Sequence, residues 1–181
     1  MLNKSNKIAI YHNLTSGGSK RELYEITKRL KNDGYEIDLY VNSIEKGQYL
    51  DLTNIVDKTF LYQYKKLEQI KFTLPFLKSI FNLLISYYNI FMLTNISRNM
   101  ALHIDKNNYA YVFIHHNKEY VQSPFIIKFL KTRSVYFCAE PQRVIYDKPL
   151  FEKIKFKTLN KKLYYKITNK FEKFCRQILL Q

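Results

Sequence analysis

The sequence is poor in cysteine, and its two cysteines, Cys138 and Cys175, lie far apart. Two widely separated thiols cannot form the disulfide framework of a small secreted domain, and they lack the spacing of zinc ligands. Neither cysteine is near the His115–His116 pair, so we expect no metal site. This composition fits a reduced, cytoplasmic protein.

Acidic residues are also scarce, with 15 against 30 lysines and arginines, which gives a formal net charge of +15. Such an excess favours anionic partners: nucleic acid, an acidic lipid surface or a phosphorylated substrate. The basic residues are scattered, however, and scattered lysines usually form a solvated surface. The charge alone therefore identifies no partner.

Several motifs that would assign a function are missing. The G-x-G-x-x-G fingerprint of dinucleotide-binding proteins is absent, and no acidic residue closes the second apolar run. The Gly-Lys-Ser/Thr ending of a P-loop is absent too, as is the G-x-S-x-G elbow of serine hydrolases. Residues 1–6 have no apolar core, so we expect no signal peptide at this end.

A long uninterrupted apolar run is missing as well. Residues 72–96 come closest, since no charge falls between Lys78 and Arg98, but asparagines and a serine interrupt them. Each buried polar group would need a partner in lipid. We therefore expect a helix buried in the domain or lying on a membrane surface, and not a membrane span.

The residues from 7 to 41 have the pattern of a βαβ unit. A short apolar run is followed by a Gly17–Gly18 loop, a helical apolar face and a second, alternating run. Ser19 and Glu22 have the spacing of a capping box, which predicts that the helix begins at Ser19. Gly34 is expected to end it as a left-handed cap residue.

The rest of the chain continues this alternation. We predict a short strand at 59–62, a helix around 100–104, a helical face at 125–130, buried strands at 111–114 and 135–139, and an amphipathic helix at 159–178. The fold class is therefore α/β, a Rossmann-like open parallel sheet with helices on both faces, in one domain of residues 1–181.

Three polar clusters follow predicted strands: His12 to Gly18, His115 to Asn117, and Glu140 to Arg143. In open parallel sheets ligands bind outside the carboxyl ends of the strands, so we expect the clusters to meet at one rim. The Gly17–Gly18 amides at a helix N-terminus suit a phosphate, a histidine can donate to a sugar oxygen, and an arginine can bind a phosphate. Each feature also has an ordinary structural interpretation, namely a tight turn, a structural hydrogen bond or an ion pair that braces a loop.

Three segments resemble the family-four glycosyltransferases. Residues 8–41 look like the opening of that family, 108–115 (NYAYVFIH) are similar to its "gyDvvhvH" strand, and 136–146 (YFCAEPQRVIY) look like the "yyChEPpRwlYe" segment of one subgroup. Two positions depart from these patterns: Ala110 stands for the aspartate of the strand, and Ala139 for the histidine before Glu-Pro.

The resemblance implies the N-terminal half of a GT-B fold and retaining transfer of sugar from a nucleotide-sugar, with no metal and no other cofactor. Gly17 and Gly18 would face the donor diphosphate, and His115 would lie beside the transferred sugar. The remaining implied residues would line the acceptor side of the cleft: His12, His116, Asn117, Glu140, Arg143 and Tyr146. The acceptor would be a glycan or lipid-linked molecule of the cell envelope, reached from the inner face of the membrane.

The Glu-x7-Glu motif of the family's donor-binding C-terminal domain is absent. The chain thus resembles an N-terminal domain truncated before that second domain, and we expect it to be inactive alone; whether it is an enzyme stays open. Two alternatives remain. One is a non-catalytic module that assists a separate glycosyltransferase chain. The other is a basic nucleic-acid-binding protein, which no recognised motif supports.

Overall fold

The computed structural model describes residues 6–14, 16–43, 50–70, 75–117 and 124–137. These residues fall into two compact units, one within the ranges 1–66 and 90–139 and the other between 67 and 89. The sheet and both of its histidine-bearing strand ends belong to the first unit.

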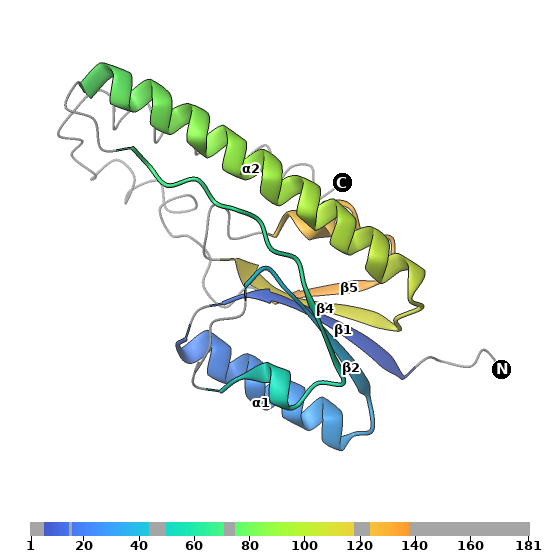
Figure 1. The fold of residues 1–181 in the computed structure, drawn as a ribbon. Helices are drawn as coiled ribbons and strands as arrows, with labels where there is room; N and C mark the ends of the chain where they lie inside the picture. The colour runs from blue at the N-terminus through green and yellow to red at the C-terminus, as the bar shows by residue number, and fades with distance from the viewer. Residues whose placement is uncertain (1–5, 15, 44–49, 71–74, 118–123, 138–181) are drawn as a thin grey trace, which may run out of the picture. The chain divides into compact units, whose positions relative to one another are not determined.

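That first unit contains a five-stranded sheet with the order β3-β2-β1-β4-β5, in which every neighbouring pair is parallel (Figure 1). Its strands are β1 (Lys7–Asn13), β2 (Glu36–Val41), β3 (Lys58–Leu61), β4 (Tyr111–Asn117) and β5 (Ser134–Phe137). The helices are α1 (Gly18–Asn32) and α2 (Pro75–Lys106), with short 3-10 turns η1 (Leu52–Asn54) and η2 (Phe125–Lys128). The predicted Rossmann-like open parallel α/β sheet is confirmed.

Side chains alternate between two hydrophobic clusters on opposite faces of the sheet. On one face, Ile8 and Ile10 of β1 lie in a cluster with Leu23 of α1. On the other face, Ala9 and Tyr11 lie in a cluster that contains buried residues of the carboxyl-terminal part of α2. Helices therefore cover both faces, as the pattern predicts (Figure 1).

The start of α1 differs from the prediction. Gly17 is the N-cap, no side chain caps the helix, and Ser19 lies inside the first turn, so the predicted capping box is wrong. The helix starts earlier because the Gly17 carbonyl already accepts the N–H groups of Lys20 and Arg21. The other end is as predicted, since Gly34 has a left-handed φ of 85° just after the helix.

The helix α2 is one continuous element where two were predicted. No glycine or proline follows Pro75 within it, so nothing interrupts it before Lys106. Of the two alternatives predicted for its apolar part, full burial in the domain does not hold, since Leu84 is 58% and Tyr87 53% exposed, and a position on a membrane surface stays a prediction. Nowhere in the described chain is a helix both long enough and apolar enough to cross a membrane.

Two later predictions need correction. The helical face predicted at 125–130 is only the 3-10 turn η2. The strand predicted as buried at 135–139 is β5, and Val135 is 52% exposed because β5 forms the edge of the sheet among the described residues, with β4 on its one paired side. Residues 138–139 and the helix predicted at 159–178 lie outside the described residues.

Candidate functional site

The order of the strands changes direction at β1. The chain passes from β1 through α1 to β2 on one side, and β4 pairs with β1 on its other side. In open α/β sheets such a switch point opens a crevice at the carboxyl ends of the strands, where ligands bind. His12 lies near the end of β1 and His115 near the end of β4, so both belong to this rim.

The environment of His12 keeps its ring neutral. The side chain is 6% exposed, and burial, followed by electrostatic interactions with Lys20 and with His115, lowers its pKa to about 3. Its Nδ1 atom accepts the N–H of Leu14 at 3.1 Å, which assigns the proton to Nε2. At neutral pH His12 can donate a hydrogen bond but carries no positive charge.

His115 is fully buried, and its ring centroid lies 5.3 Å from that of Phe137 on β5. An electrostatic interaction with His115 contributes to the lowered pKa of His12, so the two side chains are neighbours, as expected for adjacent parallel strands. Neither imidazole is open to solvent in this structure. The exposed groups of this rim come instead from the loop after β1.

That loop presents the N-terminus of α1. Ser16, Gly17 and Gly18 are exposed, and no acidic residue lies in the first turn of the helix. A Cβ atom added to Gly17 or to Gly18 would meet nothing within 4 Å, so neither glycine is required by crowding. Gly17 has a φ of 158° that strains other residues, whereas no such φ occurs at Gly18. The first amides of this helix therefore face an open approach that suits an anion.

A further polar residue at this edge was missed by the sequence analysis. Asn42 follows directly after β2 and is 5% exposed, and neither polar atom of its amide has a hydrogen-bond partner in the part of the chain that the structure describes. Val41, the residue before it, pairs with His12. The available signal in the sequence is a polar residue directly after the second apolar run.

Several predicted site residues remain without a structural test. Glu140, Arg143 and Tyr146 lie outside the described residues. The backbones of His116 and Asn117 end β4, and Asn117 pairs with Asn13 of β1. Two of the three predicted polar clusters thus begin at neighbouring strand ends, and the position of the third stays a prediction.

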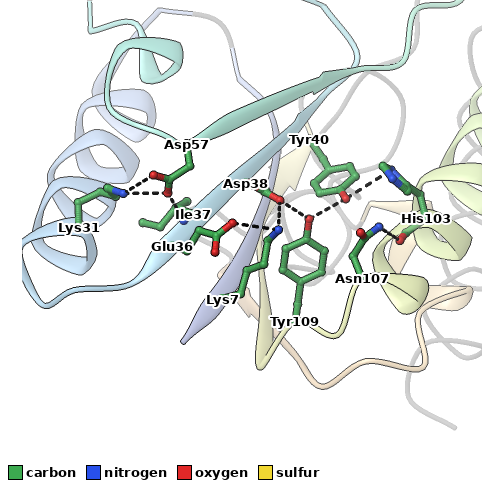
Figure 2. Close-up of polar contacts among 10 residues, drawn as sticks. All are labelled: Lys7, Lys31, Glu36, Ile37, Asp38, Tyr40, Asp57, His103, Asn107 and Tyr109. Carbon is green, nitrogen blue, oxygen red and sulfur yellow. Dashed lines mark hydrogen bonds and ion pairs between the residues drawn. The ribbon is translucent and has the colours of Figure 1, made fainter. Parts of the chain in front are cut away.

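A second polar cluster contains the buried carboxylate of Asp38 on β2 (Figure 2). Lys7 Nζ lies 2.8 Å from Asp38 Oδ2, and the Tyr109 hydroxyl donates to the same oxygen at 2.6 Å. Tyr109 also bonds to the Tyr40 hydroxyl at 3.0 Å, and Tyr40 contacts His103 Nδ1 at 3.4 Å. Burial raises the pKa of Tyr40 to about 12 and raises that of Tyr109, so both hydroxyls stay protonated. This network ties β1, β2 and α2 together and is structural.

No group of three or more histidine, cysteine, aspartate and glutamate residues suited to a metal ion occurs among the described residues. A comparison with models of known protein families and with curated proteins found no match. The fold defines the class of the protein as a Rossmann-like α/β domain.

Proposed function

We propose that this chain is the acceptor-side domain of a retaining glycosyltransferase, which transfers sugar from a nucleotide-sugar to a glycan or lipid-linked acceptor of the cell envelope. The observation that carries the proposal is the common rim of β1 and β4, where His12 and His115 lie near the ends of adjacent strands and the loop after β1 leads to the exposed N-terminus of α1. The resemblance of residues 8–41 and 108–115 to family-four enzymes supports the same assignment.

In this proposal the Gly17–Gly18 turn contacts the donor diphosphate. The positive end of the α1 dipole and its first amides favour an anion, and the absence of side chains at both glycines lets phosphate oxygens approach the backbone. The absence of an acidic residue from the first turn of α1 supports this role.

His115 is proposed to lie beside the transferred sugar. Because its ring is fully buried, this role requires that ligand binding uncovers the ring. His12, whose depressed pKa keeps it neutral, would act as a hydrogen-bond donor in the same cleft and not as a cation. Glu140, Arg143 and Tyr146 would complete the acceptor side.

A donor-binding domain of the Glu-x7-Glu type is needed for turnover, and that motif is absent from this sequence. Half of a cleft cannot exclude water or orient the donor phosphates. We therefore expect sugar transfer only when the chain is combined with such a domain, and none from the chain alone.

Gly18 allows a sharp test of the diphosphate role, because a side chain there meets no protein atom. Pyrophosphate and uridine diphosphate binding would be measured by isothermal titration calorimetry for the wild type, Gly18→Ala and Gly18→Leu. We expect Gly18→Leu to weaken binding by about tenfold or more through loss of backbone contacts, with a smaller effect of Gly18→Ala. Circular dichroism would check that both variants keep the fold. Equal affinities in all three proteins would remove the role of the loop.

Transfer itself would be tested with labelled nucleotide-sugars and lipid-linked acceptors, with and without a donor-binding domain. Transfer that occurs only in the mixture fits the proposal, and it also fits a non-catalytic module that assists a separate enzyme. The Gly18→Leu variant separates the two, because an assisting module would keep full activity with this substitution. Binding of nucleic acid that falls steeply with salt and ignores Gly18 would instead favour the basic nucleic-acid binder.

We also propose that the domain lies on the inner face of an acidic membrane. Large apolar side chains of α2 at spacings of three, four and seven share one helical face and are 41–58% exposed, namely Ile80, Phe81, Leu84, Tyr87 and Tyr88. The net charge of +15 complements anionic lipid, and aromatic residues suit the membrane interface.

Flotation with vesicles would test this location. The wild type should float with phosphatidylglycerol-containing vesicles but not with phosphatidylcholine vesicles, and a Leu84→Ser/Tyr87→Ser variant should lose binding. A matched Glu22→Ser/Glu25→Ser variant, changed on the exposed face of α1, should still float. Concentration-dependent dimers that the α2 variant abolishes, without flotation, would assign the same face to a second copy of the chain.

A further inference from the structure

Asn42 is a buried residue whose side-chain amide has no hydrogen-bond partner among the described residues. Its side chain is 95% removed from solvent, since 5% remains exposed, yet neither its amide nitrogen nor its amide oxygen has a partner among the residues described. A buried amide that has lost its bonds to water and gained none in return lowers the stability of the fold. Most buried polar groups are paired, so an exception of this kind calls for a physical reason.

Asn89 shows what the paired state looks like in the same chain. It is 1% exposed, its oxygen accepts the N–H of Leu67 at 2.9 Å, and its nitrogen donates to the Leu67 carbonyl at 2.9 Å. Both halves of the amide are thus used to hold a neighbouring segment. Asn42 makes no such contact in the described structure and holds nothing in place.

The position of Asn42 is that of a ligand-binding residue. It follows the last residue of β2, and that residue pairs with His12 on β1, so Asn42 lies at the carboxyl edge of the sheet beside the candidate site. In open α/β sheets ligands bind outside the carboxyl ends of the strands, and in the dinucleotide-binding members, whose glycine fingerprint this chain lacks, an acidic residue near the end of the second strand binds the ribose hydroxyls. An uncharged amide offers one donor group and one acceptor group, which matches a hydroxyl, itself both donor and acceptor.

We propose that Asn42 binds a ring bearing hydroxyl groups, either a sugar or the ribose of a nucleotide, held over the carboxyl edge of β1 and β2. The choice of a sugar or a ribose rests on the proposed function. The observation that the Asn42 amide is unpaired is independent of that function. Because Asn42 is 5% exposed, the ring displaces the groups that cover it when it binds. The amide then gains the bonds it lacks in the free protein.

The stability of the free protein provides the first test. Asn42→Leu keeps the number and branching of the side-chain heavy atoms and removes both unpaired polar atoms, so its melting temperature should rise by about 2–4 °C. The matched variant Asn89→Leu removes two formed hydrogen bonds and should melt at a lower temperature than the wild type. A decrease for Asn42→Leu as large as that for Asn89→Leu would overturn the proposal, because it would show that the Asn42 amide is already paired.

Binding provides the second test. Saturation-transfer NMR and calorimetry would use methyl α-D-glucopyranoside, uridine and pyrophosphate with the full 181-residue chain. The wild type should bind the glucoside if the ring is that of a sugar, or uridine if it is a ribose, and Asn42→Leu should weaken that binding by about tenfold or more. Absence of binding by both ring probes, or equal binding by the variant, would overturn the proposal.

Pyrophosphate separates this inference from the proposed function. Asn42→Leu should bind pyrophosphate like the wild type, whereas Gly18→Leu should not. If ring binding depends on Asn42 while pyrophosphate binding ignores Gly18, the diphosphate role fails and the assignment of Asn42 stands. If pyrophosphate binding depends on Gly18 while ring binding does not depend on Asn42, the diphosphate role stands and the assignment of Asn42 fails.

Discussion

The pair formed by Lys7 and Asp38 gives the sharpest quantitative prediction. The Asp38 side chain is fully buried, Lys7 is 20% exposed, and their charged atoms lie 2.8 Å apart (Figure 2). Lys7→Met would leave a buried carboxylate whose remaining hydrogen bond among the described residues comes from the Tyr109 hydroxyl. Removing one member of a buried pair costs about 3–5 kcal/mol, and the partial exposure of Lys7 places the expected loss near 3 kcal/mol.

Urea denaturation followed by far-ultraviolet circular dichroism would measure this loss, a suitable method since the chain contains no tryptophan. The matched control is Lys31→Met, because Lys31 and its partner Asp57 are 31% and 35% exposed. Exposed pairs contribute little, so the control should lose less than about 1 kcal/mol.

A double variant, Lys7→Met/Asp38→Leu, separates the ion pair from the burial of its carboxylate. Replacing both charges by apolar side chains of similar size is often neutral, so the double variant should regain most of the stability that Lys7→Met loses. The reasoning is refuted if Lys7→Met unfolds like the control, or if the double variant is less stable than Lys7→Met.

Three further predictions concern single residues. Tyr109→Phe removes the 2.6 Å bond to buried Asp38 and should cost about 2 kcal/mol in urea denaturation. Gly34→Ala forces a side chain into a φ of 85° and should cost about 1 kcal/mol, while Gly18→Ala, where no such φ occurs, should cost nothing measurable in the same assay. His12 has a pKa of about 3 in the folded state, against 6.5 for a free histidine. Between pH 6.5 and pH 3 the histidine therefore binds a proton in the unfolded state but not in the folded state. The contribution of His12 to the stability of the fold is therefore complete above pH 6.5 and is lost as the pH falls toward 3. The free energy of unfolding should depend less steeply on pH in His12→Gln than in the wild type over this range.

The fold could be predicted from the sequence because its signals are local. The apolar run of β1, the alternation of β2 and the glycine after α1 each act within a few residues, and all three appear where expected. The errors come from contacts between distant residues. The apolar pattern around Val135 predicts a buried strand residue. Its exposure depends instead on the position of β5 at the edge of the described sheet, which no local pattern indicates.

The site was predictable only in part. A common rim for His12 and His115 follows from a parallel sheet, which the apolar runs indicate, whereas the pairing of β1 with β4 appears only in the structure. The burial of both rings does not follow, because it depends on the packing around them. The unpaired state of Asn42 is likewise invisible in the sequence, since an asparagine after a strand normally indicates a turn.

The central place of β1 affects how the sheet assembles. Its partner β2 lies within one βαβ unit, but its other partner, β4, begins about a hundred residues later in the chain, at Tyr111. Until that segment has been synthesised, one hydrogen-bonding edge of an apolar strand stays open to wrong pairing with other chains. Closing so long a loop also slows folding, which makes the arrival of β4 the step at which a nascent chain of this protein is protected from aggregation.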